Sequence, residues 1–68
     1  MLSKFANKIR ELHFVENVEL EDEELTVMFS SNPTTYSKQL SEVRNEYPTV
    51  VKTNEYNTEN EYIQIYST

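Results

Sequence analysis

Cysteine, glycine and tryptophan are all missing from this chain of 68 residues. Without cysteine there is no disulfide framework, thiolate metal site or thiol nucleophile, and the chain suits a reducing cytoplasm. Without glycine, phosphate-binding loops of the G-x-G-x-x-G and G-x-x-x-x-G-K types are excluded. We therefore expect a cytoplasmic protein that carries no cofactor.

Positive charge is scarce: six Lys and Arg stand against twelve Asp and Glu, which gives a net charge of −6. This surplus repels the phosphate backbone, so direct binding to nucleic acid is not expected. Long apolar runs are missing as well, and the first residues lack the apolar stretch of a signal peptide. The sequence therefore predicts neither secretion by that route nor a membrane span.

The length predicts one domain, residues 1–68, with a thin core, because a chain this short buries only about 60% of its unfolded surface. A ligand pocket of about 300 Å³ or more would hollow out so small an interior. We therefore expect a binding protein and not an enzyme.

The first segment has apolar residues at the period of a helix face: Leu2, Phe5, Ile9 and Leu12. We predict a helix from Ser3 to His13, with Ser3 as its N-cap. His13 is the single histidine of the chain, so a two-histidine metal site is impossible. At the end of a helix its protonated form would interact favourably with the helix dipole, which favours a structural role over catalysis.

A β-hairpin is predicted next, with strands over 14–21 and 25–29 and Asp22-Glu23 as a two-residue loop. This loop length sets Leu20 opposite Leu25 and Val18 opposite Val27, so the apolar sides of both strands coincide. The loop has no Asn-Gly or Asp-Gly, so a longer loop is an alternative.

Asn32 and Pro33 form a strong helix start, because Asn caps well and proline at the first helical position loses no needed hydrogen bond. The predicted helix spans 33–46 and stops before Pro48. A second hairpin follows, with strands from Thr49 and over 62–66 around a turn at 57–60. A loop of two or four residues sets Val51 on the side of Tyr62 and Tyr66, and an odd loop sets it with Ile63 and Ile65.

The chain thus reads α-β-β-α-β-β, as two halves of about 2–31 and 32–68 that each place a helix before a hairpin. Moving the first strand of the ferredoxin-like order β-α-β-β-α-β to its end gives this pattern. We predict an α+β domain of permuted ferredoxin-like architecture, with two helices on one face of a four-stranded antiparallel sheet. The second and fourth strands are central, and charged outer strands protect the edges.

Two surfaces of this predicted fold are candidate binding sites for another protein. If the apolar residues Leu25, Val27, Phe29, Ile63 and Ile65 point toward the helices, the side chains that alternate with them on the same strands point away. These form an open sheet face of Thr26, Met28, Tyr62, Gln64 and Tyr66. Tyr and Met are enriched at protein interfaces, although Tyr also tolerates water in strands. Base stacking on such aromatics is disfavoured, because RNA-binding sheets carry basic residues beside them.

The first hairpin carries a dense set of carboxylates: Glu16, Glu19, Glu21, Asp22, Glu23 and Glu24. Their spacing lacks the glycine and ligand pattern of a calcium loop, so no metal site is predicted. The alternatives are a solubilising surface or a strip that engages a basic protein surface and competes there with nucleic acid.

The sequence therefore favours a small acidic protein-binding module that acts as an inhibitor, an adaptor or an accessory subunit. An inhibitor of a nucleic-acid enzyme, of phage or mobile-element origin, fits this description. The alternative is a self-assembling protein in which two open sheet faces pack together as a homodimer.

Overall fold

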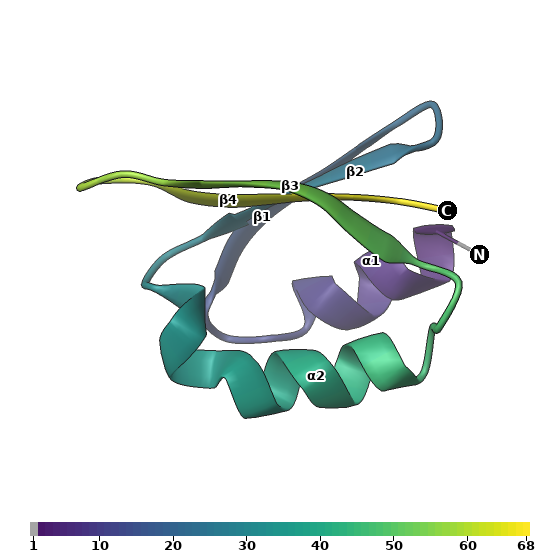
Figure 1. The fold of residues 1–68 in the computed structure, drawn as a ribbon, viewed down its shortest axis with the longest axis horizontal. Coiled ribbons are helices and arrows are strands. Elements are labelled where there is room, and N and C mark those ends of the chain that lie inside the picture. Colours follow the sequence, from purple (N-terminus) through teal and green to yellow (C-terminus); the bar gives the residue numbers. More distant parts are fainter. Residues whose placement is uncertain (1) are drawn as a thin grey trace.

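The computed structural model describes residues 2–68 and has its helices and strands in the predicted order α-β-β-α-β-β. The elements are α1 (Leu2–Arg10), β1 (Val15–Glu21), β2 (Glu24–Phe29), the 3-10 helix η1 (Pro33–Tyr36), α2 (Ser37–Asn45), β3 (Val51–Asn57) and β4 (Tyr62–Ser67). The strands form one antiparallel sheet in the order β1-β2-β4-β3. Both helices lie on the same side of this sheet (Figure 1). The predicted architecture, including the two central strands, is confirmed.

Helix α1 differs from its prediction at both ends. It begins at Leu2, so Ser3 lies inside the first turn and is not the N-cap, and it ends at Arg10 instead of His13. The backbone then tightens, with Leu12 N donating to Ile9 O at 3.1 Å. This turn places Phe14 in the core, where its side chain is almost fully buried. The helix thus ends three residues earlier than predicted, and the turn that follows it leads to the buried Phe14.

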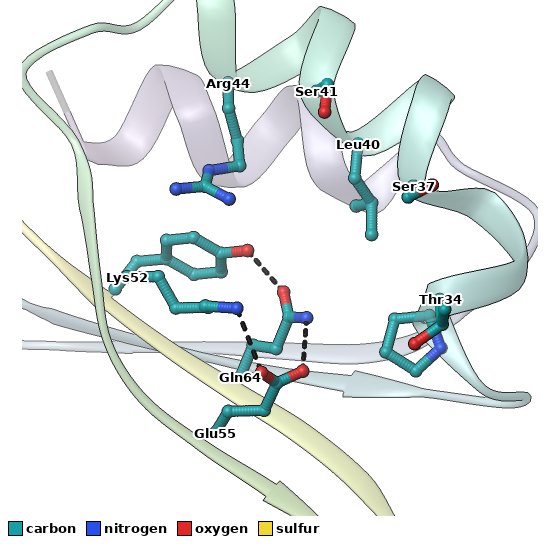
Figure 2. A pocket seen from close by; sticks show the side chains of 10 residues that line it. Thr34, Ser37, Leu40, Ser41, Arg44, Lys52, Glu55 and Gln64 are labelled. Carbon is teal, nitrogen blue, oxygen red and sulfur yellow. Dashed lines mark hydrogen bonds and ion pairs between the residues drawn. The ribbon is translucent and has the colours of Figure 1, made fainter.

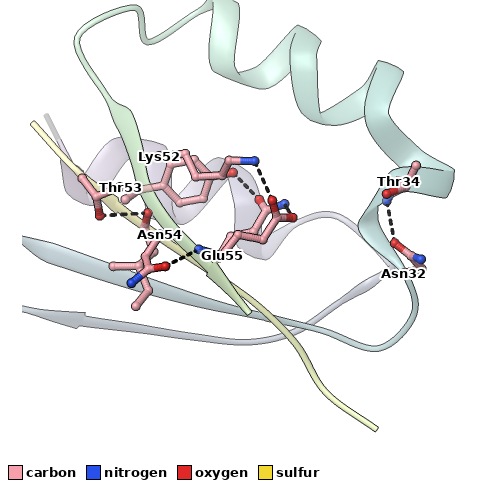
Figure 3. Close-up of polar contacts among 9 residues, drawn as sticks. Asn32, Thr34, Lys52, Thr53, Asn54 and Glu55 are labelled. Atoms are coloured by element: carbon pink, nitrogen blue, oxygen red, sulfur yellow. Dashed lines mark hydrogen bonds and ion pairs between the residues drawn. The ribbon is translucent and has the colours of Figure 1, made fainter. Parts of the chain in front are cut away.

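The predicted start of the second helix is confirmed by its cap. The Asn32 side chain accepts a hydrogen bond from Thr34 N at 3.0 Å (Figure 3), and Pro33 occupies the first helical turn. That turn is 3-10, and α2 continues from Ser37 to Asn45. The structure thus contains the predicted helix of 33–46 as two joined pieces.

The first hairpin has the predicted two-residue loop, since Glu21 pairs with Glu24 across Asp22 and Glu23. Val18 pairs with Val27 and Leu20 with Leu25, as the apolar pattern requires. Asp22 has a φ of 53°, in the left-handed region that favours glycine. Aspartate tolerates this region better than most residues, so it substitutes for the missing Asn-Gly turn.

The second hairpin has a four-residue loop, because Asn57 pairs with Tyr62. That loop alone would set Val51 on the side of Tyr62 and Tyr66. The register shifts between Lys52 and Asn54, however, so Val51 pairs with Ser67 and lies on the side of Ile63 and Ile65. A bulge at residue 53, not the loop length, therefore decides which face Val51 occupies.

Most of the core lies between α1 and the first hairpin. Helix α1 packs against β1 and β2, whereas α2 packs against α1. The core side chains are Leu2, Phe5, Ala6, Ile9, Phe14, Val18, Leu25, Val27, Phe29, Leu40, Val43, Val50 and Tyr66. Tyr36 of η1 closes one end by stacking on Phe14 at 4.0 Å between ring centroids. This arrangement leaves a groove between α2 and the β3–β4 hairpin.

Candidate functional sites on the two faces of the sheet

The strand register divides the sheet into a face under the helices and an open face. The face under the helices is the one that holds the buried side chains of Leu25, Val27 and Phe29. Residues opposite each other in antiparallel strands lie on the same face. The open face therefore holds three cross-strand rows. They are Asn17–Met28–Ile63–Tyr56, Glu19–Thr26–Ile65–Asn54 and Glu21–Glu24–Ser67–Val51.

The predicted facing of β4 was wrong. Tyr66 pairs with Leu25, Gln64 with Val27 and Tyr62 with Phe29, so all three lie under the helices. The Tyr66 side chain is 1% exposed and meets Phe5 edge-on, with centroids 5.1 Å apart. The large ring fills the space beneath α1.

Of the predicted open-face residues, Thr26 and Met28 do lie on the open face, and both are half-buried among neighbours. Their companions are not tyrosines of β4 but apolar residues of β3 and β4. We call this set the apolar strip: Met28, Val51, Tyr56, Ile63 and Ile65. Tyr56 and Val51 are 49% and 53% exposed, so the strip is open to a partner.

Side chains support the strip on the edge strand. At the bulge, Thr53 Oγ1 donates to Ile65 O at 3.3 Å, and Asn54 Oδ1 accepts from Glu55 N at 2.9 Å (Figure 3). Asn54 Nδ2 also donates to the Tyr56 hydroxyl at 2.8 Å. The first two bonds give backbone groups beside the bulge a side-chain partner, and the third joins Asn54 to the ring of the apolar strip.

The predicted acidic residues are all exposed, and the structure distributes them over the first hairpin. Glu19, Glu21 and Glu24 lie on the open face beside the apolar strip, while Asp22 and Glu23 form the loop. Glu16 stands at the register shift of β1. No Lys or Arg occupies any of the three open-face rows. The open face is thus apolar on one side and negative on the other.

No group of three or more His, Asp or Glu side chains within residues 2–68 could hold a metal ion. In the same range, no helix is long and apolar enough to cross a membrane.

His13 does not end a helix, because α1 stops at Arg10. Its exposed imidazole lies in the following turn, edge-on to Phe14 and Tyr36 at 5.3 and 5.4 Å between centroids. This packing replaces the predicted interaction with the helix dipole. A structural role for His13 remains the prediction.

The polar network under α2 was not predicted from the sequence. The Tyr66 hydroxyl donates to Gln64 Oε1, Gln64 Nε2 donates to Glu55 Oε2 at 3.0 Å, and Lys52 Nζ donates to Glu55 Oε1 at 2.9 Å (Figure 2). The guanidinium carbon of Arg44 lies 5.8 Å from the centre of the Tyr66 ring. These residues line the groove between α2 and the second hairpin.

The network shifts two pKa values. Hydrogen bonds from Lys52, and then from Gln64, lower the pKa of Glu55 because they stabilise its charged form. Burial raises the pKa of Tyr66 to about 12, although the charge of Arg44 acts in the opposite direction. At neutral pH the network therefore contains a carboxylate and a neutral phenol.

One sequence signal for this network was present, because Gln64 interrupts the apolar residues of β4. A buried polar residue needs a partner, and Gln64 is 5% exposed. Its partners Glu55 and Tyr66 become visible only with the register of β3 and β4.

Comparison with known proteins gives no identification. The chain matches no protein-family model, and neither a curated protein nor a solved structure is detectably similar to it. Its function must therefore be inferred from its own residues.

Proposed function

We propose that this chain is a small non-catalytic protein-binding module whose open sheet face docks on a basic protein surface with an apolar centre. The observation that carries the proposal is the composition of that face. The apolar strip lies beside the carboxylates of Glu19, Glu21 and Glu24, and no cation shares the face. Apolar area supplies affinity on association, and complementary charge supplies encounter rate and selectivity.

A partner with basic residues around an apolar patch matches both features. Surfaces that bind nucleic acid carry such basic residues. A module that covers one competes with nucleic acid for it, so the proposal includes an inhibitor or accessory subunit of a nucleic-acid enzyme.

Self-assembly through the same face fits less well. In a two-fold dimer each face meets a second copy of itself, and the second copy brings more carboxylates without a base. Carboxylates that lose water without gaining a cation weaken association. The charge pattern therefore favours a different protein as the partner.

The test is capture from the source cell's lysate with matched baits. The baits are the wild type, an apolar-strip variant (Ile63→Thr with Ile65→Thr), a charge variant (Glu19→Gln with Glu21→Gln) and a control on α2 (Lys38→Gln). We expect the same protein with the wild type and the control, weaker capture by the charge variant, and loss of at least about tenfold with the strip variant. Threonine keeps the β-branched shape, so the strand should persist.

Salt separates the two contributions, because it screens exposed charge but not apolar contact. Retention by the wild type should fall with salt more steeply than retention by the charge variant. Undiminished capture of the same protein by the strip variant would contradict the proposal. So would light scattering that shows a wild-type dimer abolished by the strip substitutions.

A further inference from the structure

The groove between α2 and the second hairpin lies under the helices, on the other side of the sheet from the apolar strip. Its volume is about 210 Å³, and its lining is mainly polar. Ser37, Ser41 and Arg44 come from α2, and Lys52 and Glu55 come from β3. Figure 2 shows the Arg44 side chain reaching from α2 toward Lys52, with Glu55 and Gln64 beyond it. The groove could admit a small ligand without touching the open face.

The three α2 residues occupy one face of the helix. Positions 37, 41 and 44 are separated by four and three residues, the spacing that brings side chains together on a helix surface. Two hydroxyl groups and a guanidinium therefore face the groove together. A neighbouring hollow toward Pro48 shares Ser41 and Arg44, so a ligand can reach both residues from solvent.

Arg44 is the cation without a carboxylate partner in this groove. Within residues 2–68, Lys52 pairs with Glu55 at 2.9 Å, and no acid lies within ion-pair distance of Arg44. The Tyr66 ring lies 5.8 Å from the guanidinium carbon, which is a cation–π arrangement. This contact places the guanidinium beside the groove and leaves its N–H donors free.

The charges of Lys52 and Glu55 cancel, so the groove carries the single positive charge of Arg44. A planar guanidinium with free donors binds the oxygens of carboxylates and phosphates in pairs. Hydroxyl groups such as those of Ser37 and Ser41 donate further hydrogen bonds to an oxyanion.

We propose that the α2 groove binds a small oxyanion, either a carboxylate or a phosphate group, through Arg44 with Ser41 and Ser37. The ligand would replace the carboxylate partner that Arg44 lacks. This site is separate from the proposed docking face, and neither proposal depends on the other.

The experiment is a titration of the isotope-labelled full chain, followed by backbone amide shifts in two-dimensional NMR. Inorganic phosphate and acetate are added in separate series, with ionic strength held constant by chloride. We expect saturable shifts in 37–44 and in the parts of β3 and β4 that line the groove. Saturation by phosphate alone identifies a phosphate site, and saturation by acetate alone identifies a carboxylate site.

Matched variants test the residues. Arg44→Gln should weaken binding at least about tenfold, because it removes the charged donors. Lys38→Gln makes the same charge change on an exposed part of α2 and should leave binding unchanged. Ser41→Ala should weaken it about threefold, and this variant keeps Arg44 over Tyr66, so it tests the site even if Arg44→Gln unfolds.

The proposal is overturned if neither anion produces a saturable shift. Equal weakening by Arg44→Gln and Lys38→Gln would also overturn it, because this result shows a response to net charge and not to a site.

Discussion

The two α-β-β halves of the chain place the same elements in the same order but fill the space under their helices differently. Helix α1 buries Leu2, Phe5, Ala6 and Ile9 against the first hairpin. Helix α2 buries Leu40 and Val43, and it packs on α1 instead of on its own hairpin. The first half therefore supplies most of the apolar core, and the second half adds Leu40, Val43, Val50 and Tyr66.

Under α2 the sheet presents a polar network that begins at Lys52 and ends at Tyr66. Buried polar groups contribute little net free energy even when every hydrogen bond is made. The second half thus has less apolar packing under its helix and has a groove there instead. A chain of this size thus concentrates its core at one hairpin and leaves more polar surface at the other.

The largest expected difference between the halves is in the stability lost when a buried leucine of each is replaced by alanine. Leu25 of β2 is fully buried under α1, whereas Leu40 of α2 is 6% exposed and lines the groove. Leu25→Ala should lower the free energy of unfolding by about 4 kcal/mol, and Leu40→Ala by about 2 kcal/mol, because the groove side can relax. Urea denaturation measures both losses. Equal losses would mean that the two halves are packed alike.

The second prediction uses the pKa of Tyr66, which burial raises from 10.0 to about 12. The unfolded chain loses this proton at a lower pH than the folded chain, so its stability contribution is complete below pH 10 and is lost as pH rises toward 12. Between about pH 8 and pH 11 the free energy of unfolding should fall by about 1.4 kcal/mol from this group.

Urea denaturation of the wild type and of Tyr66→Phe at both pH values checks this loss. The variant lacks the titrating hydroxyl, so its stability should fall less across the range. Parallel losses in the two proteins would show that other groups cause the alkaline destabilisation.

A smaller change in the free energy of unfolding is expected from the backbone conformation that distinguishes the two hairpin loops. The first loop holds Asp22 at a φ of 53°, and the second spreads its turn over four residues in which Glu61 N donates to Thr58 Oγ1 at 3.0 Å. Asp22→Gly should raise the free energy of unfolding by about 0.5 kcal/mol, since glycine adopts this φ without steric cost. Thermal unfolding measures the gain.

The control is Glu23→Gln, which removes one negative charge from the same loop without addressing the φ of Asp22. An equal gain from both substitutions would assign the effect to charge repulsion among the acids of the hairpin.

Local patterns were sufficient for the element order, the capped second helix and the register of the first hairpin. The first hairpin was predictable because a single register sets Val18 opposite Val27 and Leu20 opposite Leu25 on the same face of the sheet. The end of α1 was not predicted, because the apolar spacing continues to Leu12 whereas the helix ends at Arg10.

The facing of β4 and the groove were decided by tertiary structure. Ile63 and Ile65 alternate with Tyr62, Gln64 and Tyr66, so both sides of β4 contain apolar surface and the strand pattern alone is ambiguous. Pairing with β2 resolved it by setting Tyr66 opposite Leu25 beneath α1.

By itself the sequence determined the fold class, the acidic surface and the strand order, because these follow from composition and from periodic patterns within single segments. Only the tertiary structure decided which residues meet in the apolar strip and in the α2 groove. The physical reason is that both surfaces depend on the residue-by-residue register between β2, β4 and β3, including the bulge in β3. One bulged residue, Thr53, was enough to move Val51 from one face of the sheet to the other.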